Sequence, residues 1–434
     1  MLQITIDDKT VDRILVWVMY LQLVILEFFG LGNMLNKVIS VVILLRIFSR
    51  YGGFAIRQRA FCLAVCSLLL YLLSGIFSSD INLSTLYSNL LNIVYPMIYS
   101  FYIYILFRCQ SEVMDHFIEK GAWVFNLTMV VNFFVLYRQI TVPYSINAVP
   151  VRTEIGYYED LISGLFQYAS THIVCLFTCF IVVYNLARRK RYDNMGRRML
   201  TYIFVLLVII ISAVIALQSD NKALFLIMPL IIFVYFWLLH AGNGHRGTLK
   251  IVSGICFVFV ILIVLYSMIP SVHNFLDDNV LSMFNLVSNA YRLGNSTNGS
   301  SERIAMLLYA LNEASTWFFG KGFGSSGIFA SGYLGFEHFG QSDLALMLIL
   351  GGFWYTFIMV WFYINMFNQI VGGEYRLTGM QRAGILVLFL CVAIYTHCMT
   401  TTDTAICMML IVSAYRSGLR NIHGDISDIE QSCS

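Results

Sequence analysis

The chain has 434 residues, of which 59% are hydrophobic and only 12% charged, and its formal net charge is +3. Soluble domains carry about twice that share of charged residues. The composition therefore excludes an ordinary soluble enzyme, a disordered chain and a strongly basic nucleic-acid-binding protein. The mean hydropathy of +0.76 and the grouping of apolar residues into blocks of about twenty indicate an all-α polytopic membrane protein.

The apolar blocks predict about twelve transmembrane helices within one integral membrane domain, residues 1–434. Acidic residues and no basic cluster precede the first block, so we read it as a retained anchor rather than a cleaved signal peptide. In chain order the expected spans are 14–31, 34–49, 60–77, 86–107, 121–137, 161–186, 199–217, 224–240, 251–268, 343–367, 382–399 and 404–418.

The basic connection 187–198 sets the expected orientation. It contains six arginines and lysines against a single Asp193, and such connections remain on the cytoplasmic side. Counting spans outward from it places both termini in the cytoplasm, with a C-terminal tail at 419–434. The same count places two long connections, 138–160 and 269–342, on the external side.

The first external connection carries an arginine in its middle, Arg152, followed by acids that end with Asp160. External arginines oppose the usual bias of positive charge, so Arg152 calls for an anionic partner. That partner is either an acid of the same connection or a phosphate group of a substrate, which a guanidinium binds through two parallel hydrogen bonds.

The second external connection predicts an amphipathic surface helix at 303–319. Apolar side chains recur at helical spacing in Ile304, Leu308 and Leu311, and Gly320 would end the helix. Such a helix would lie on the membrane surface or cover a cavity that opens there. Arg303 stands in its first turn.

A glycine-rich stretch follows this helix, with Gly320, Gly322 and Gly324 at alternate positions. Its backbone N–H groups could approach an anion closely, although the composition is equally compatible with a solvated connection. Ionisable residues stand near its end, where the chain re-enters the membrane. These are Glu337, His338 and Asp343.

The ten cysteines predict neither disulfides nor a metal site. Most lie within apolar blocks, where a thiol behaves as a small hydrophobic group. The pairs Cys62/Cys66 and Cys175/Cys179 have helical spacing, but no nearby histidine or acid completes a ligand set. No metal and no cofactor are expected.

Three short patterns occur in these external connections. Ser301-Glu302-Arg303 precedes the expected helix and the Gly-x-Gly segment, Arg152 stands shortly before Gly156, and His338 and Ser342-Asp343 precede Gly351-Gly352. With the many spans and two enlarged external connections, this layout resembles the Wzy-type O-antigen and capsular polysaccharide repeat-unit polymerases and the related O-antigen ligases.

The resemblance implies a membrane glycosyltransferase in the bacterial inner membrane. It would transfer a growing glycan from undecaprenyl diphosphate to the non-reducing end of an incoming lipid-linked repeat unit on the external face. Arg303, Arg152 and Arg292 are the expected diphosphate ligands, and His338 is the expected base, with Glu337, Asp160 and Asp343 as alternatives. The resemblance also implies a chain-length regulator as a possible partner.

The sequence is also compatible with two other functions. A ligase would share the chemistry and differ in its acceptor. A flippase for lipid-linked oligosaccharides should carry charged residues deep in its spans, whereas here His172 and His397 are the main ionisable groups within apolar blocks. Polar residues gather on one side of the membrane instead, which favours the enzyme.

Overall fold

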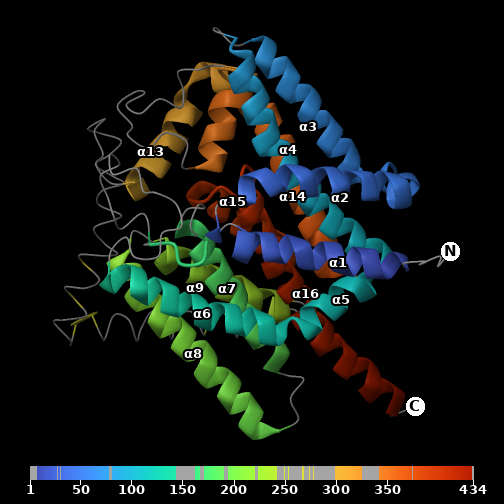
Figure 1. Cartoon of the computed structure of the whole chain (residues 1–434), viewed down its shortest axis with the longest axis vertical. Helices are drawn as coiled ribbons and strands as arrows, with labels where there is room; N and C mark the ends of the chain where they lie inside the picture. Colours follow the sequence, from blue (N-terminus) through green and yellow to red (C-terminus); the bar gives the residue numbers. More distant parts are fainter. Residues whose placement is uncertain are drawn as a thin grey trace.

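The computed structural model is all-helical in the residues that it describes (Figure 1). These are 7–26, 28–29, 31–77, 81–142, 162–166, 171–189, 194–219, 223–241, 299–324, 342–373 and 375–432, with isolated positions between 249 and 277. This confirms the predicted all-helical fold class, with helices that are long and apolar enough to span a membrane.

The first part of the chain forms six α-helices and a short π-helix. They are α1 (Asp8–Leu21), η1 (Gln22–Leu26), α2 (Gly32–Ala55), α3 (Arg59–Ile76), α4 (Leu83–Cys109), α5 (Ser111–Lys120) and α6 (Ala122–Thr141). The second part contributes α7 (Thr171–Arg188), α8 (Met195–Gln218), α9 (Leu224–Ala241), α13 (Gly299–Asn312), η5 (Ala314–Trp317), α14 (Asp343–Gly372), α15 (Gly379–Tyr395) and α16 (Thr402–Ser432).

Seven of the described helices are long and apolar enough to cross a bilayer, and eight if the pair α5–α6, bent by 50°, crosses as one. They are α2, α3, α4, α7, α8, α9 and α14. Twelve spans therefore remain a prediction. The first expected span corresponds to α1 and η1, and the last two correspond to α15 and α16. The expected span 251–268 lies outside the described residues, apart from isolated positions.

Helix α7 forms the centre of the bundle. Every residue from Thr171 to Ala187 is buried, and α7 packs against α16, α8 and α9. Helix α8, by contrast, turns large apolar side chains such as Leu206, Leu207 and Ile210 outward. Continuous apolar surface of this kind is unfavourable in water, so the outer helices are suited to lipid.

Helix α14 is broken within the bundle by a glycine. Gly352 has φ 76° and ψ −179°, a conformation that residues with a Cβ rarely adopt. The turn that begins at Gly320 fills the break, because the N–H groups of Lys321 and Gly322 donate to the carbonyl oxygens of Ile349 and Leu350 at 2.7 and 2.9 Å. Irregular backbone is tolerated at membrane depth only where such partners exist.

The helix expected at 303–319 is shorter than predicted. The α-helix ends at Asn312, and Glu313 is extended with φ −77° and ψ 120° before the short η5 begins. The chain changes direction here because the residues after η5 must reach the break in α14. Leu308 and Leu311 are exposed, while Met306 and Ala310 are fully buried.

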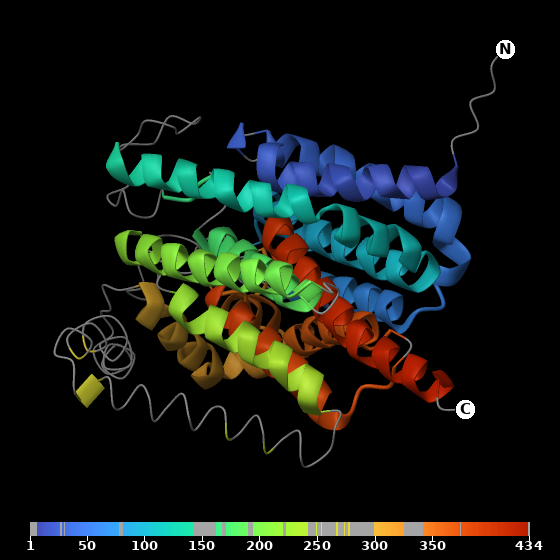
Figure 2. The ribbon, with the colours of Figure 1, turned by 90° about the horizontal axis from the view of Figure 1, so that it is seen from below.

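The bundle has two distinct ends. Lys9 of α1 pairs with Glu112 of α5 at 2.6 Å, and Asp115 of α5 pairs with Arg420 of α16 at 2.6 Å. Figure 2 shows the start of α1 and the end of α16 at the same end of the bundle, where these ion pairs lie, and α13 at the opposite end. Which end faces the cytoplasm remains a prediction.

Candidate active site

Four ionisable side chains meet at the end of the bundle that carries α13. His172 lies in the first turn of α7, Asp343 opens α14, His397 follows α15, and Arg303 projects from α13. Three of them belong to helices, and His397 stands in the loop between α15 and α16.

Asp343 is fully buried and holds the loop between α15 and α16. Its carboxylate accepts hydrogen bonds from the backbone N–H groups of Met399 and Thr400 and from the Thr400 hydroxyl. It also lies 3.4 Å from Nδ1 of His397. The first turn of α14, which Ser342 caps through the N–H of Ala345, adds the favourable field of a helix N-terminus.

This contact orients the imidazole of His397. When Nδ1 carries the proton and donates it to the Asp343 carboxylate, Nε2 keeps its lone pair and can accept a proton. A carboxylate that fixes the tautomer of a histidine in this way is a recurring arrangement around general bases. The His397 side chain remains 24% exposed, so a ligand can reach it.

Arg303 and His172 form a second, buried contact. Nη2 of Arg303 lies 3.1 Å from Nε2 of His172. Because a guanidinium only donates, Nε2 of His172 is the acceptor. The rings of His172 and His397 lie edge to face with their centroids 5.9 Å apart. The four side chains are therefore contiguous.

Hydrogen bonds among three polar side chains connect α13, and with it Arg303, to the rest of the bundle. The Tyr309 hydroxyl donates to Glu313 at 2.9 Å and accepts from Nζ of Lys321 at 3.1 Å. Burial is the largest cause that raises the pKa of Tyr309, so its hydroxyl keeps its proton at neutral pH. Lys321 belongs to the turn that fills the break in α14, so this turn also positions α13.

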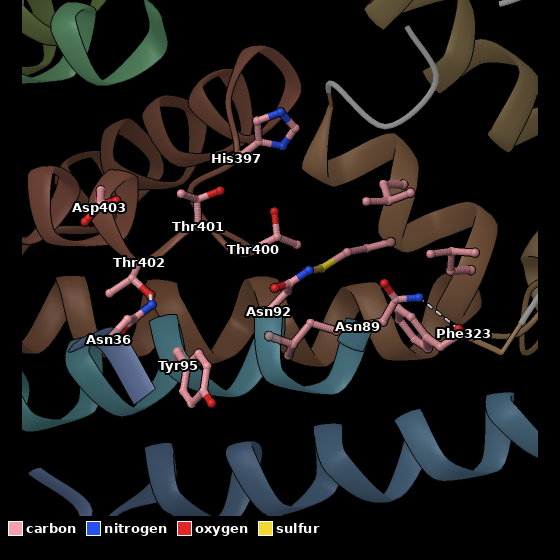
Figure 3. Close-up of a pocket in the computed structure, with 14 residues that line it drawn as sticks. Asn36, Asn89, Asn92, Tyr95, Phe323, His397, Thr400, Thr401, Thr402 and Asp403 are labelled. Atoms are coloured by element: carbon pink, nitrogen blue, oxygen red, sulfur yellow. Dashed lines mark hydrogen bonds between the residues drawn. The ribbon is translucent and has the colours of Figure 1, made fainter. Parts of the chain in front are cut away.

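A cavity of about 340 Å³ opens beside His397. Figure 3 shows Asn89 and Asn92 of α4 opposite His397 and Thr400, with Asn36 of α2 at one side. The remaining described lining residues are Ile93, Tyr95, Phe323, Leu346, Met347, Leu350, Thr401, Thr402 and Asp403. The polar lining is made mostly of amides and hydroxyls, which both donate and accept.

The structure brings together two of the residues singled out from the sequence, Arg303 and Asp343. Asp343, expected as one alternative for the base, is buried under the loop it holds. The other ionisable residues expected at the site fall outside the described part of the chain. These are Arg152, Asp160, Arg292, Glu337 and His338.

The first N–H groups of the Gly-x-Gly segment are used within the protein rather than presented to an anion. Those of Lys321 and Gly322 are donated to α14. A Cβ at Gly320 would lie 2.6 Å from the carbonyl oxygens of Ile349 and Leu350. Gly324 continues the packing, because its carbonyl accepts from the N–H of Asn82. These glycines serve close backbone approach rather than exposed flexibility.

Sequence reasoning did not assign His172, His397 or the asparagines to a site. A signal was present, because both histidines stand at the edges of apolar blocks where few other ionisable residues occur. Nothing in the sequence, however, indicates that residues so far apart face one another. Within the described residues, no group of three or more His, Cys, Asp or Glu side chains is placed to hold a metal ion.

Comparisons with known proteins add no assignment. No family model, no curated protein and no solved structure matches this chain.

Proposed function

We propose that this chain is an integral-membrane glycosyltransferase that polymerises lipid-linked oligosaccharides. The glycan would pass from undecaprenyl diphosphate to the non-reducing end of an incoming repeat unit. One observation carries the proposal: His397 stands between a cavity lined mostly by amides, hydroxyls and apolar side chains and the buried Arg303–His172 contact. The cavity suits a sugar, the guanidinium suits an anion, and an oriented imidazole lies between them.

The reaction assigns a step to each group. A hydroxyl of the acceptor sugar attacks the anomeric carbon of the donor sugar, and its proton passes to Nε2 of His397. The bond from that carbon to the diphosphate oxygen breaks, and the electron pair leaves with the lipid diphosphate. General-base assistance of this kind contributes about 10²–10⁴-fold in rate.

Arg303 would stabilise the charge that develops on the departing diphosphate. A guanidinium keeps its charge at every relevant pH and matches phosphate geometry, and fixed donors act most strongly in a site from which water is excluded. Arg152 and Arg292 remain predicted as further diphosphate ligands. His338 as the base, with Glu337, Asp160 and Asp343 as alternatives, remains a prediction from the sequence; the exposure of His397 to the cavity supports His397 instead.

A reconstituted assay tests the proposal. The purified chain in proteoliposomes receives undecaprenyl-diphosphate-linked repeat units, and the products are separated by length on gels. We expect a ladder of polymers from the wild type, and single units from the His397→Ala and Arg303→Ala variants. Ladders of normal length from both variants would refute the assigned roles, and a wild type without any polymer would refute the function.

A flippase for the same lipid-linked substrate is the second candidate. The observation that favours it is the presence of acids buried among helices, Asp343 and Asp403 beside the cavity and Asp12 at the other end, as expected of transport pathways. A transbilayer-movement assay in the same proteoliposomes separates the two. Substrate movement without polymer would favour the flippase, and polymer from substrate supplied on one face only would favour the polymerase.

A further inference from the structure

The charge of the cavity lining restricts what it can bind. Among the described residues that line it, none is lysine or arginine, and one, Asp403, is an acid. Arg303 does not line the cavity, and its Nη2 is engaged with His172. A negatively charged group inside the cavity would therefore meet an acid and no described cation.

The shape of the lining suits a sugar ring. The lining combines amides and hydroxyls from α2, α4 and the segment that leads into α16 with the apolar side chains of Leu346, Met347 and Leu350 of α14 and with Phe323. Pyranose rings have polar edges and apolar faces. The volume of about 340 Å³ lies at the lower end of small-molecule sites, roughly 300–1,000 Å³.

Asn92 is the amide best placed to contact a ligand. The side-chain amide of Asn89 donates to the carbonyl of Phe323 at 2.9 Å, and that of Asn36 donates to the Thr402 hydroxyl at 2.9 Å. The Asn92 side chain makes no hydrogen bond with the residues that the structure describes, and Figure 3 shows it at the cavity on the side that faces His397 and Thr400.

We propose that this cavity selects an uncharged sugar, bearing hydroxyl or acetamido groups, and rejects sugar carboxylates. A carboxylate placed here would lose its hydration without gaining a cationic partner, and like charges brought together at an interface are strongly unfavourable. The inference rests on the proposed function, because it concerns the sugar held next to His397. It adds that this reacting sugar is neutral and that Asn92 and Asp403 determine the selection.

Binding without turnover tests this selection. The full chain in nanodiscs is applied to an array of neutral disaccharides built from glucose, galactose, mannose and N-acetylhexosamines, alongside the same disaccharides oxidised at C6 to the uronic acid. We expect the wild type to bind at least one neutral disaccharide about tenfold more tightly than its acidic counterpart, a difference of ~1.4 kcal/mol.

Two variants and a control locate the effect. Asn92→Ala should weaken neutral binding about tenfold, within the range for a polar group removed from a site. Asp403→Asn should bring the neutral and acidic affinities to within about threefold of each other, since the like charge is gone. Asp115→Asn removes the same charge at the opposite end of the bundle and should leave the ratio unchanged.

The outcomes are decisive in both directions. Three results would overturn the inference: the wild type binds no neutral disaccharide, it binds the acidic forms equally well, or Asn92→Ala binds every disaccharide as the wild type does. If Asp403→Asn does not fold, the binding data for Asn92→Ala decide the question. Selective binding without polymer from lipid-linked units would retain the sugar site and refute the polymerase. Polymer formed as readily from uronic-acid units as from neutral ones would support the polymerase and refute the selection of a neutral sugar.

Discussion

The two ends of the bundle use buried charge in opposite ways. At the end that carries the start of α1, Asp12 is fully buried and accepts hydrogen bonds from Arg46, Tyr51 and Tyr102 at 2.5–3.0 Å. At the other end, Asp343 holds a loop and a histidine, and the histidine faces a cavity.

The difference lies in where the polar groups point. Around Asp12 the partners surround the carboxylate, which is the arrangement of a structural network. Around His397 the polar groups of the loop and of α4 point into open volume. A buried charge whose hydrogen bonds are all made by protein groups stabilises the fold, whereas polar groups arranged around a cavity are available to bind a ligand. The first end should therefore respond to mutation in stability, and the second in activity.

Removal of the proposed base should have the largest effect. His397→Ala should lower the rate of polymer formation by about 10²–10⁴-fold while the protein accumulates and elutes normally, as measured by single-turnover assays on purified protein. His116→Ala, on α5 at the opposite end, is the matched control and should retain full activity. Activity within about threefold of wild type in His397→Ala would remove this residue from the chemistry.

Breaking the structural network should affect stability instead. Asp12→Ala leaves the 13%-exposed side chain of Arg46 without its main partner, and breaking a buried pair costs about 3–5 kcal/mol. Membrane abundance and the thermal unfolding midpoint in detergent should both fall. A stable Asp12→Ala protein that lacks only activity would show that both ends take part in function.

Arg303 should affect activity with little change in stability. Loss of a donor to developing charge costs about 10²–10³-fold, so Arg303→Ala should produce almost no polymer, and Arg303→Lys should recover part of it because the charge remains without the planar fork. Arg50→Ala, which removes an exposed partner of Asp8, serves as the control. If Arg303→Lys and Arg303→Ala lose activity equally while Arg50→Ala is normal, geometry rather than charge is the requirement.

The filled break in α14 should be sensitive to a single methyl group. In Gly352→Ala the new Cβ would overlap the carbonyl oxygen of Phe318, and this backbone conformation costs a residue other than glycine about 1–3 kcal/mol. The unfolding midpoint should therefore fall. Gly379→Ala, where nothing lies within 4 Å of the added Cβ, should leave the midpoint unchanged or slightly raised. Equal midpoints in both variants would contradict the packed turn.

The smallest effect is expected at the exposed ion pair between α5 and α16. Asp115→Asn removes the partner of Arg420, whose side chain is 57% exposed, and such pairs contribute about 0–1 kcal/mol. Neither the unfolding midpoint nor the polymer length should change measurably. A loss of polymer with an unchanged midpoint would assign this end a role beyond structure.

The sequence by itself determined the helical membrane architecture and part of the site. Apolar runs of about twenty residues act locally, because each must satisfy its own backbone in lipid, and so most of the expected spans recur as helices. Arg303 and Asp343 stood out for a similarly local reason, since each is a charge beside an apolar segment.

Tertiary structure alone decided what these residues face. Asp343 and His397 are 54 positions apart, and Arg303 and His172 are 131 apart, so no periodicity of a single helix relates them. The turn at Gly320 meets Gly352 only because α14 breaks there, and the extended Glu313 ends α13 so that the chain can reach that break. Helix formation depends on neighbours in sequence, whereas the site depends on which helix ends pack together, and that packing is settled by side-chain contacts between segments distant in the chain.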